Sequence, residues 1–196
     1  MIGSFLGAIS GGSLYRQASF LLDRVGRQIF PEWLSIIEDP HIQRGFRSAY
    51  FDAEGVATRK SPLVIDGKIE RYILGSYSAR KLGLSTTGNA GGVHNLSVTA
   101  NSEDLQSLIK QMGTGLLVTE LMGQGVNTLT GDYSRGAAGF WVENGEIQYA
   151  VDELTIAGNL ATMLPAIEAI GADIDRRSHI SVGSMLIGKM TVAGND

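Results

Sequence analysis

The sequence predicts an α+β fold with a mostly antiparallel β-sheet and flanking helices. A barrel-like form of the sheet is one alternative. Two hairpin signals, Asp-Gly at 66–67 and Asn-Gly at 144–145, each lie between β-rich arms. Residues 105–112 have the apolar spacing of an amphipathic helix. Because strands and helices do not alternate in βαβ order, a parallel sheet is not favoured.

Length and composition predict one globular domain spanning residues 1–196. Of the 196 residues, 43% are hydrophobic and 18% are charged, which is typical of a chain that buries its own core. The 26 glycines predict many turns and close backbone approaches. No apolar run approaches the roughly 20 residues that cross a bilayer, and the opening MIGSFLGAIS lacks the features of an export signal. We therefore expect no membrane contact and interpret the opening as part of the fold.

Cysteine usage and charge exclude several classes of protein. With no cysteine, the chain has no disulfide, thiolate nucleophile or cysteine-based zinc site, and we expect a cytoplasmic location. The chain has 16 Lys and Arg against 20 Asp and Glu, a net charge of -4. Because proteins that bind nucleic acid need a basic surface, this balance argues against direct nucleic acid binding.

The first hundred residues predict short elements separated by glycine and proline breaks. Pro31 ends an apolar segment, and Gly88, Gly91 and Gly92 rule out regular structure before the next strand. Residues 44–50 are left unassigned. The predicted elements are a helix at 4–12, an amphipathic turn or helix at 20–30, a strand at 33–38, a hairpin at 63–77, a helix at 78–84 and a strand at 93–100.

The second half predicts one clear helix and a series of strands. The helix at 105–112 follows polar cap residues at 101–104 and ends near Gly113. The other predicted elements are a buried strand at 116–122, a hairpin with arms at 139–142 and 147–151, a strand at 154–157, a helix at 160–170 interrupted by Pro165, and one or two strands at 180–192.

No catalytic motif is complete in the sequence. The histidines His41, His94 and His179 lie far apart, and none has a second ligand at helical spacing. No Gly-x-Ser-x-Gly elbow or phosphate-binding glycine loop occurs. His94, beside Asn95 after a glycine loop, is either presented to a cleft or is a loop histidine bonded to its own backbone.

A polar cluster at Asp132, Tyr133, Ser134 and Arg135 is the second candidate. As a turn, it can orient a peptide or carboxylate through bidentate hydrogen bonds from Arg135; alternatively, Asp132 and Arg135 pair with each other. Glu120 lies in the apolar strand LLVTELMG, where a buried carboxylate needs a partner, unless it points outward. The candidate residues for binding a peptide or partner are His94, Asn95, Glu120, Asp132, Tyr133, Ser134 and Arg135.

Three long stretches, residues 7–26, 76–95 and 113–160, closely resemble the C-terminal half of the PmbA (TldE) branch of the TldD/PmbA family. The similarity extends from Ile2 to Gly194. It implies that the family's preceding N-terminal domain is absent from this chain. It also implies a role in a cytoplasmic TldD–PmbA metallopeptidase that acts on unfolded peptides.

The resemblance further implies a subunit without a metal. TldD-like subunits carry a His-Glu-x-x-x-His helix and a downstream Cys that form a zinc site, and the alignment places these on residues 2–7 and at or beside Val182. The ligand positions here are apolar or lack a side chain. We therefore expect no catalytic residue and no cofactor in this chain, with zinc held by a TldD-like partner.

The implied partners are a TldD-like subunit and a peptide substrate, with a homodimer as a possible further assembly. Two alternatives stay open. One is a regulatory protein-binding module of the DNA gyrase modulator type. The other is a peptidase active alone, through a metal bound by His94, His179 and carboxylates in an unrecognised geometry. Two hairpins also predict a sheet rim that can receive an extended peptide by main-chain hydrogen bonding.

Overall fold

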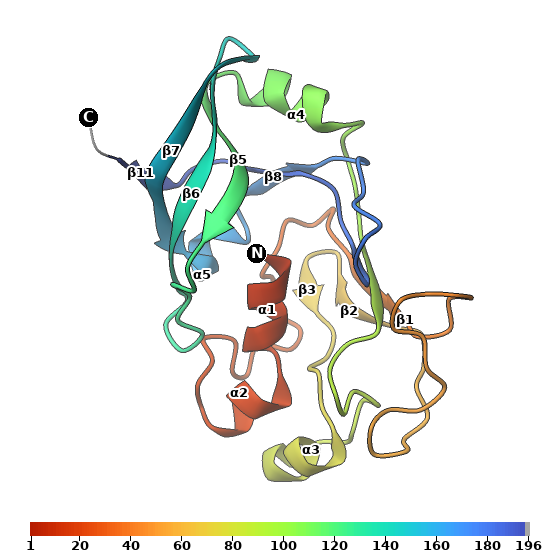
Figure 1. Cartoon of the computed structure of the whole chain (residues 1–196). Coiled ribbons are helices and arrows are strands. Elements are labelled where there is room, and N and C mark those ends of the chain that lie inside the picture. Colours follow the sequence, from red (N-terminus) through yellow and green to blue (C-terminus); the bar gives the residue numbers. More distant parts are fainter. Residues whose placement is uncertain (195–196) are drawn as a thin grey trace.

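The structure, a computed structural model, describes residues 1–194, which form three β-sheets connected by loops and short helices (Figure 1). The helices are α1 (Ile2–Ala8), α2 (Gly11–Tyr15), α3 (Ser76–Leu82), α4 (Leu105–Met112) and α5 (Leu160–Met163). The strands are β1 (Ile36–Asp39), β2 (Ser61–Ile65), β3 (Lys68–Ile69), β4 (Asn95–Val98), β5 (Gly115–Met122), β6 (Asp132–Glu143), β7 (Glu146–Asn159), β8 (Ile167–Ile170), β9 (Ile180–Ser181), β10 (Met185–Ile187) and β11 (Thr191–Ala193). The predicted α+β class is confirmed.

The strands pair almost entirely antiparallel. A five-stranded sheet has the order β3-β2-β1-β4-β9, in which only the β4–β9 pair is parallel. A four-stranded sheet has the order β11-β7-β6-β5, and β8 pairs with β10 in a third sheet. Within residues 1–194 no sheet closes on itself, so the barrel-like arrangement is not formed. The strand β5 is instead left as an edge of the four-stranded sheet.

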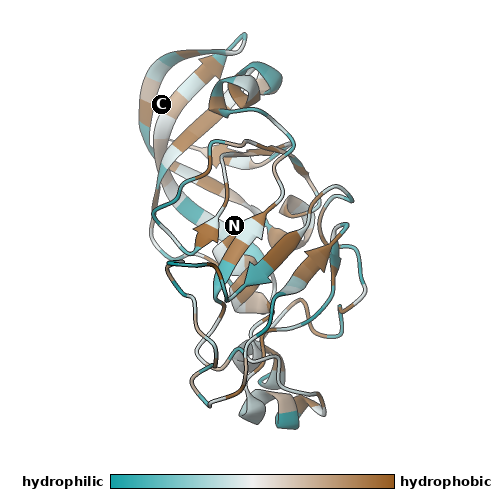
Figure 2. Cartoon of the chain, turned by 90° about the vertical axis from the view of Figure 1, so that its right-hand side faces the viewer, coloured by the Kyte–Doolittle hydropathy of each residue, from teal (hydrophilic) through white to brown (hydrophobic). Residues whose placement is uncertain are grey.

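The main core lies where α1 and α2 pack against the five-stranded sheet and the base of the four-stranded sheet. Phe5 of α1 and Phe30 meet edge to face with ring centroids 4.9 Å apart, and both are fully buried. A smaller cluster of Leu108, Ala169 and Leu186 joins α4 to β8 and β10. Figure 2 shows the apolar residues gathered on strands in the middle of the molecule. The upper part of the four-stranded sheet extends beyond this core (Figure 1).

Local sequence signals fixed the clearest elements. The Asp104 side chain accepts a hydrogen bond from the Ser107 amide at 2.8 Å and caps α4, which ends at Gly113. The Asn144-Gly145 turn joins β6 to β7 with φ values of 54° and 74°, the left-handed backbone that this type of turn requires. The Asp66-Gly67 hairpin is confirmed, but its second arm is only β3 and ends at Ile69 rather than Tyr77. The helix predicted at 78–84 is present as α3, two residues earlier.

Elements without such signals were predicted less well. Residues 20–30 form turns rather than a helix, and residues 160–170 divide into α5 and β8 around Pro165. The segment 154–157 is the end of the long β7 rather than a separate strand, and 180–192 contains three strands. No helix in the described part of the chain has the length and apolar character needed to span a membrane.

Gly139 is a position where the sheet leaves no room for a side chain. A Cβ built there lies 1.9 Å from the Leu117 carbonyl oxygen, so backbone must move. We expect Gly139→Ala to lower the free energy of unfolding by about 1–3 kcal/mol, the usual cost of overpacking. The matched change Gly3→Ala, where a Cβ meets nothing within 4 Å, is expected to stabilise α1 by about 0.5–1 kcal/mol. Urea denaturation of both variants measures this, and equal effects would contradict the packing described.

Candidate functional site

A buried carboxylate, Glu38 of β1, organises the polar interior of the five-stranded sheet. It accepts hydrogen bonds from the His94 backbone amide at 2.6 Å, from His94 Nδ1 at 3.0 Å and from Asn89 Nδ2 at 2.9 Å. Arg71 Nη2 also donates to it and forms a salt bridge. We call Glu38, Arg71, Asn89 and His94 the polar hub. It ties β1 to the segment after β3 and to the glycine-rich loop before β4.

The hub keeps Glu38 ionised inside the protein. Burial on its own raises the pKa of this carboxyl group, but the amide of His94, the positive charge of Arg71 and the side chain of Asn89 outweigh it. The net result is a pKa below the usual Glu value. All of these partners come from the protein itself, so we interpret the hub as structural support rather than as a reaction centre.

The structure corrects the expectation for His94 and shows what Asn95 does. The His94 ring is buried against Glu38, and it is neither presented to a cleft nor bonded to its own backbone. The Asn95 side chain accepts from the Arg47 amide at 3.0 Å and donates to Ser48 Oγ at 2.8 Å. These two candidates therefore fix loops in place.

The Asp132 to Arg135 segment is the first part of strand β6 rather than a turn, and the Asp132–Arg135 pair is not formed. Asp132 instead accepts from Thr130 Oγ1 at 2.6 Å and from Asn159 Nδ2 at 3.0 Å. These two hydrogen bonds lower the pKa of Asp132, and the bond from Thr130 has the larger effect. Arg135 Nε donates to the Met122 carbonyl oxygen at 3.2 Å. Asp132 and Arg135 therefore form hydrogen bonds with neighbouring segments at the end of the four-stranded sheet.

The remaining candidates differ in exposure because β-strand residues alternate between faces. Tyr133 is buried and burial raises the pKa of its phenol, whereas Ser134 is exposed and its amide donates to the Gly125 carbonyl at 2.6 Å. Glu120 is exposed on the edge strand β5, as in the alternative that it points outward. The predicted buried strand at 116–122 is likewise half-buried at its start and exposed at its end.

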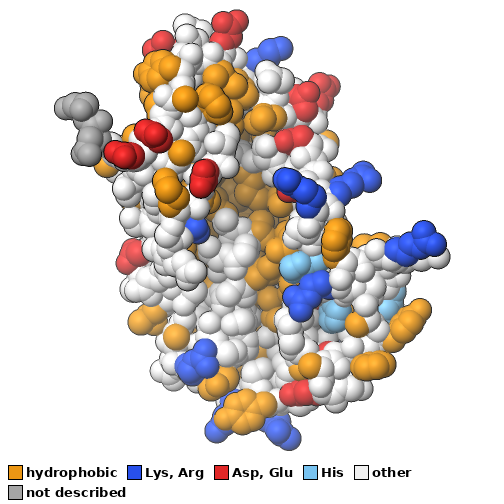
Figure 3. Space-filling model, in the orientation of Figure 1, with side chains coloured by type: hydrophobic (Ala, Val, Ile, Leu, Met, Phe, Trp, Pro, Cys, Tyr) orange, Lys and Arg blue, Asp and Glu red, His pale blue; other side chains and the backbone are white. Residues whose placement is uncertain are grey.

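A long apolar groove of about 870 Å³ lies between the four-stranded sheet and the α4–β10 side of the molecule. One wall is the four-stranded sheet, with Tyr133, Trp141 and Ile156, and the other is α4 and β10, with Leu108, Met112 and Met185. The space-filling view in Figure 3 shows a hollow lined by hydrophobic side chains between these two parts of the molecule. Of the predicted site residues, Tyr133 alone lines this groove.

The edge strand β5 borders the groove along its length. Residues 114–119 line the groove consecutively, together with Leu121. Because successive strand side chains point to opposite faces, a continuous run indicates that the strand edge itself faces the groove. On this edge the backbone N–H and C=O groups of β5 have no neighbouring strand within residues 1–194.

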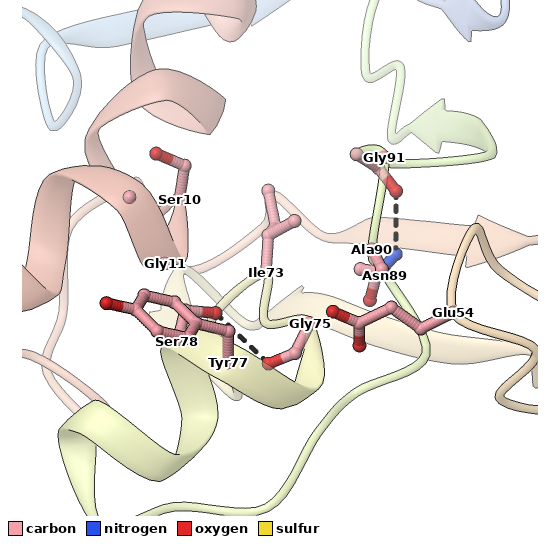
Figure 4. A pocket seen from close by; sticks show the side chains of 12 residues that line it. Ser10, Gly11, Glu54, Ile73, Gly75, Tyr77, Ser78, Asn89, Ala90 and Gly91 are labelled. Carbon is pink, nitrogen blue, oxygen red and sulfur yellow. Dashed lines mark hydrogen bonds between the residues drawn. The ribbon is translucent and has the colours of Figure 1, made fainter.

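A smaller hollow of about 320 Å³ lies between α2, α3 and the glycine-rich loop (Figure 4). Glu54 and Tyr77 lie at its sides, and backbone from Gly11, Gly75 and Gly91 forms much of the lining. The Glu54 carboxylate is already bonded to the Ser76 amide at 2.6 Å. This hollow therefore has few free polar groups, and the apolar groove is the better candidate site.

The residues at the family's expected metal positions do not fit a metal. In α1, Ile2, Phe5 and Leu6 are buried in the core, and Gly3 and Gly7 have no side chain. Val182 packs against the same core. Zinc is bound by imidazole, thiolate or carboxylate groups, and these positions supply none. Over residues 1–194, no three His, Cys, Asp or Glu side chains come together as a metal-binding group.

The comparisons with known proteins agree with this fold. A family model described as the PmbA/TldA metallopeptidase C-terminal domain matches residues 1–194. The chain belongs to this family. It is 55% identical over 194 residues to Metalloprotease PmbA of Escherichia coli O157:H7, covering 99% of this chain and 43% of that protein. It is 56% identical to a Metalloprotease PmbA homolog of Haemophilus influenzae, covering 100% of this chain and 44% of the relative.

Solved structures show the same family fold. A protein from Bacteroides thetaiotaomicron VPI-5482, named in connection with modulation of DNA gyrase, matches with a TM-score of 0.93 and 30% identity, over 99% of this chain and 44% of that one. TldE from Thermococcus kodakarensis matches with a TM-score of 0.83 and 26% identity, over 98% and 48%. The chain thus spans less than half the length of these relatives.

Sequence reasoning missed most of the polar hub. Glu38, Arg71 and Asn89 were not identified, although one signal was present, because Glu38 follows Ile36 and Ile37 in a short apolar strand. A carboxylate in such a strand needs partners if it is buried. The partners lie 33 to 56 residues away in the sequence, and only the sheet order brings them together.

Replacing Glu38 by Gln tests the hub. It leaves the Arg71 side chain, which is 13% exposed, without its counter-charge, and we expect the free energy of unfolding to fall by about 3–5 kcal/mol at neutral pH. Because the folded-state pKa of Glu38 lies below the usual 4.5, its stabilisation is complete above that pH and is lost as pH falls through the folded-state value. Glu38→Gln should therefore flatten the acid limb of stability measured by denaturant unfolding.

The matched control is Asp66→Asn, which removes a carboxylate from the exposed turn between β2 and β3. We expect it to change stability by less than about 0.5 kcal/mol, as surface substitutions usually do. Equal losses from both variants would show that the hub does not depend on the charge of Glu38.

Proposed function

We propose that this chain is the non-catalytic, PmbA-like part of a cytoplasmic TldD–PmbA-type metallopeptidase, in which it holds extended peptides beside a partner's metal centre. Membership of a metallopeptidase family supports the chemistry of the complex. The groove and the free edge of β5 support the binding of a peptide.

The observation that carries the non-catalytic role is the packing of α1. Its ligand positions hold Ile2, Gly3 and Gly7, and Ile2 is buried in the main core. An aliphatic side chain and two glycines cannot coordinate zinc. The zinc of the complex is therefore assigned to a TldD-like partner, and this chain contributes binding and shape.

The groove suits a peptide in extended form. A strand added along β5 pairs its main-chain groups with the free edge, which gives affinity independent of sequence. Its alternate side chains then meet apolar positions such as Leu116, Leu121 and Trp141. An unfolded peptide exposes both its backbone and its apolar side chains, whereas a folded protein buries them. The geometry thus favours unfolded substrates.

Leu121→Asp tests the peptide site. Leu121 lines the groove and is 40% exposed, so a carboxylate is tolerated there by the fold but is unfavourable beside a bound apolar side chain. We expect the Kd for a fluorescein-labelled, apolar, unstructured peptide, measured by fluorescence anisotropy, to rise about tenfold or more, the equivalent of 1.4 kcal/mol.

The control is Leu129→Asp, because Leu129 is 53% exposed and lies outside the groove lining. It should leave the Kd unchanged. If both variants bind the peptide as well as the unmodified chain, the groove is not the peptide site.

Mixing experiments test the division of labour. We expect the purified chain alone to hold no stoichiometric zinc by mass spectrometry of metals and to leave an unfolded casein substrate intact. Adding a TldD-like subunit should produce hydrolysis, with zinc eluting with that subunit. One tightly held zinc per chain would favour a peptidase active alone. Retention on immobilised DNA gyrase, with none on the TldD-like subunit, would favour the regulatory alternative.

A further inference from the structure

The methionines of the chain are concentrated in the apolar groove. Of the six methionines in the sequence, five line it: Met1, Met112, Met163, Met185 and Met190. The lining makes up 26 of the 196 residues, too small a share to hold most of the methionines if they were evenly distributed. The sixth, Met122, is 42% exposed and lies outside this lining. Because the chain has no cysteine, its sulfur is gathered largely at one site.

Three of these methionines are open to the groove. Met112 is the last residue of α4, Met185 is the first residue of β10, and Met190 lies between β10 and β11. All three are half-buried and line the hollow, whereas Met163 is only 2% exposed. A small solute in the groove therefore meets the side chains of Met112, Met185 and Met190.

The sulfur of Met112 lies against the start of the free strand edge. A Cβ built on Gly115, the first residue of β5, would lie 2.7 Å from Met112 Sδ. The thioether thus occupies the space that a side chain at this position would need. An oxygen atom added to this sulfur has no room on the strand side. It is therefore directed into the groove, beside the backbone groups with which an extended peptide would pair.

We propose that the apolar groove is a site of methionine oxidation, in which conversion of Met112, Met185 and Met190 to sulfoxides weakens peptide binding. The oxidant is a peroxide. With hydrogen peroxide, the O–O bond breaks, an S–O bond forms, the sulfur loses two electrons, and the other oxygen leaves as water. Methionine sulfoxide reductases reverse the step, because their thiols are oxidised to a disulfide while the sulfoxide oxygen leaves as water. The modification is therefore reversible.

Oxidation changes the character of the groove wall. A thioether is flexible and apolar, and it fills the gaps around apolar side chains of different shapes. A sulfoxide is polar, and beneath a bound apolar side chain its oxygen loses water without gaining a hydrogen-bond donor. Beside Gly115 the same oxygen can also compete with the carbonyl groups of a peptide for the free amides of β5. Both the side-chain and the main-chain contacts of a peptide are therefore weakened.

This inference rests on the proposed function and adds the regulation of the same site. Peroxide treatment of the whole chain tests it. Hydrogen peroxide oxidises the chain, catalase removes the excess, and peptide mapping by mass spectrometry locates the added oxygen atoms. The binding probe is a fluorescein-labelled, apolar, unstructured peptide without methionine, cysteine or tryptophan, followed by fluorescence anisotropy.

We expect the three groove methionines to be oxidised and the Kd for the probe to rise about tenfold or more, because each sulfoxide oxygen loses hydrogen bonds to water when the peptide binds. Methionine sulfoxide reductases A and B with a thiol should return the Kd to within about twofold of the value for the reduced chain, since together they act on both sulfoxide epimers. Circular dichroism before and after treatment verifies the fold.

Leucine variants identify the side chains responsible. Met112→Leu/Met185→Leu/Met190→Leu keeps the apolar volume but removes the oxidisable sulfurs. Whatever its Kd before treatment, the ratio of its Kd values after and before peroxide should be close to one. The matched control is Met122→Leu, which should keep the full rise. If the triple variant does not fold, protection decides: saturating peptide should slow oxidation of the groove methionines of the unmodified chain and not that of Met122.

The outcomes separate this inference from the proposed function. A reduced chain that does not bind the probe would contradict the proposed function, and the oxidation control with it. A reduced chain that binds, together with an oxidised chain that binds equally well, would overturn the oxidation control alone. So would unmodified groove methionines in a chain whose Met122 is oxidised, or a Met122→Leu variant whose Kd no longer responds to peroxide.

Discussion

The arrangement of the five-stranded sheet depends on one buried carboxylate. Glu38 needs several donors to remain ionised inside the protein, and it obtains them from Arg71, Asn89 and His94. Once these are in place, the glycine-rich loop is fixed, and Asn95 at its end orients the segment that follows β1. The hydrogen bonds of the buried Glu38 carboxylate thus help to position the exposed segment that follows β1.

The polar hub and the apolar groove differ in what they leave unsatisfied. In the hub the carboxylate has its hydrogen-bond partners within the chain, so it is suited to fixing loops and not to binding a ligand. The groove, by contrast, leaves the edge of β5 unpaired and keeps apolar side chains such as Trp141 partly accessible. Free backbone groups beside an apolar surface gain most from an extended chain placed along them.

How much the sequence could predict depended on the range of the interactions. The Asn144-Gly145 turn, α3 and the capped helix α4 are specified by neighbouring residues, and the structure contains them. The order of three separate sheets and the partners of Glu38 depend on residues far apart in the chain. The same limit applies to the exposure of Glu120. The composition of its segment cannot distinguish a buried strand from an edge strand.

Helix α1 is where the family resemblance and the packing meet. The positions that the alignment gives to metal ligands lie on the helix that contributes Ile2, Phe5 and Leu6 to the main core. A carboxylate or imidazole in place of Ile2 would be buried in the core without a hydrogen-bond partner. Its loss of hydration would then destabilise the fold. The helix therefore stabilises the fold around Phe5 and Phe30, and the side chains at Ile2, Gly3 and Gly7 offer no ligand for a metal.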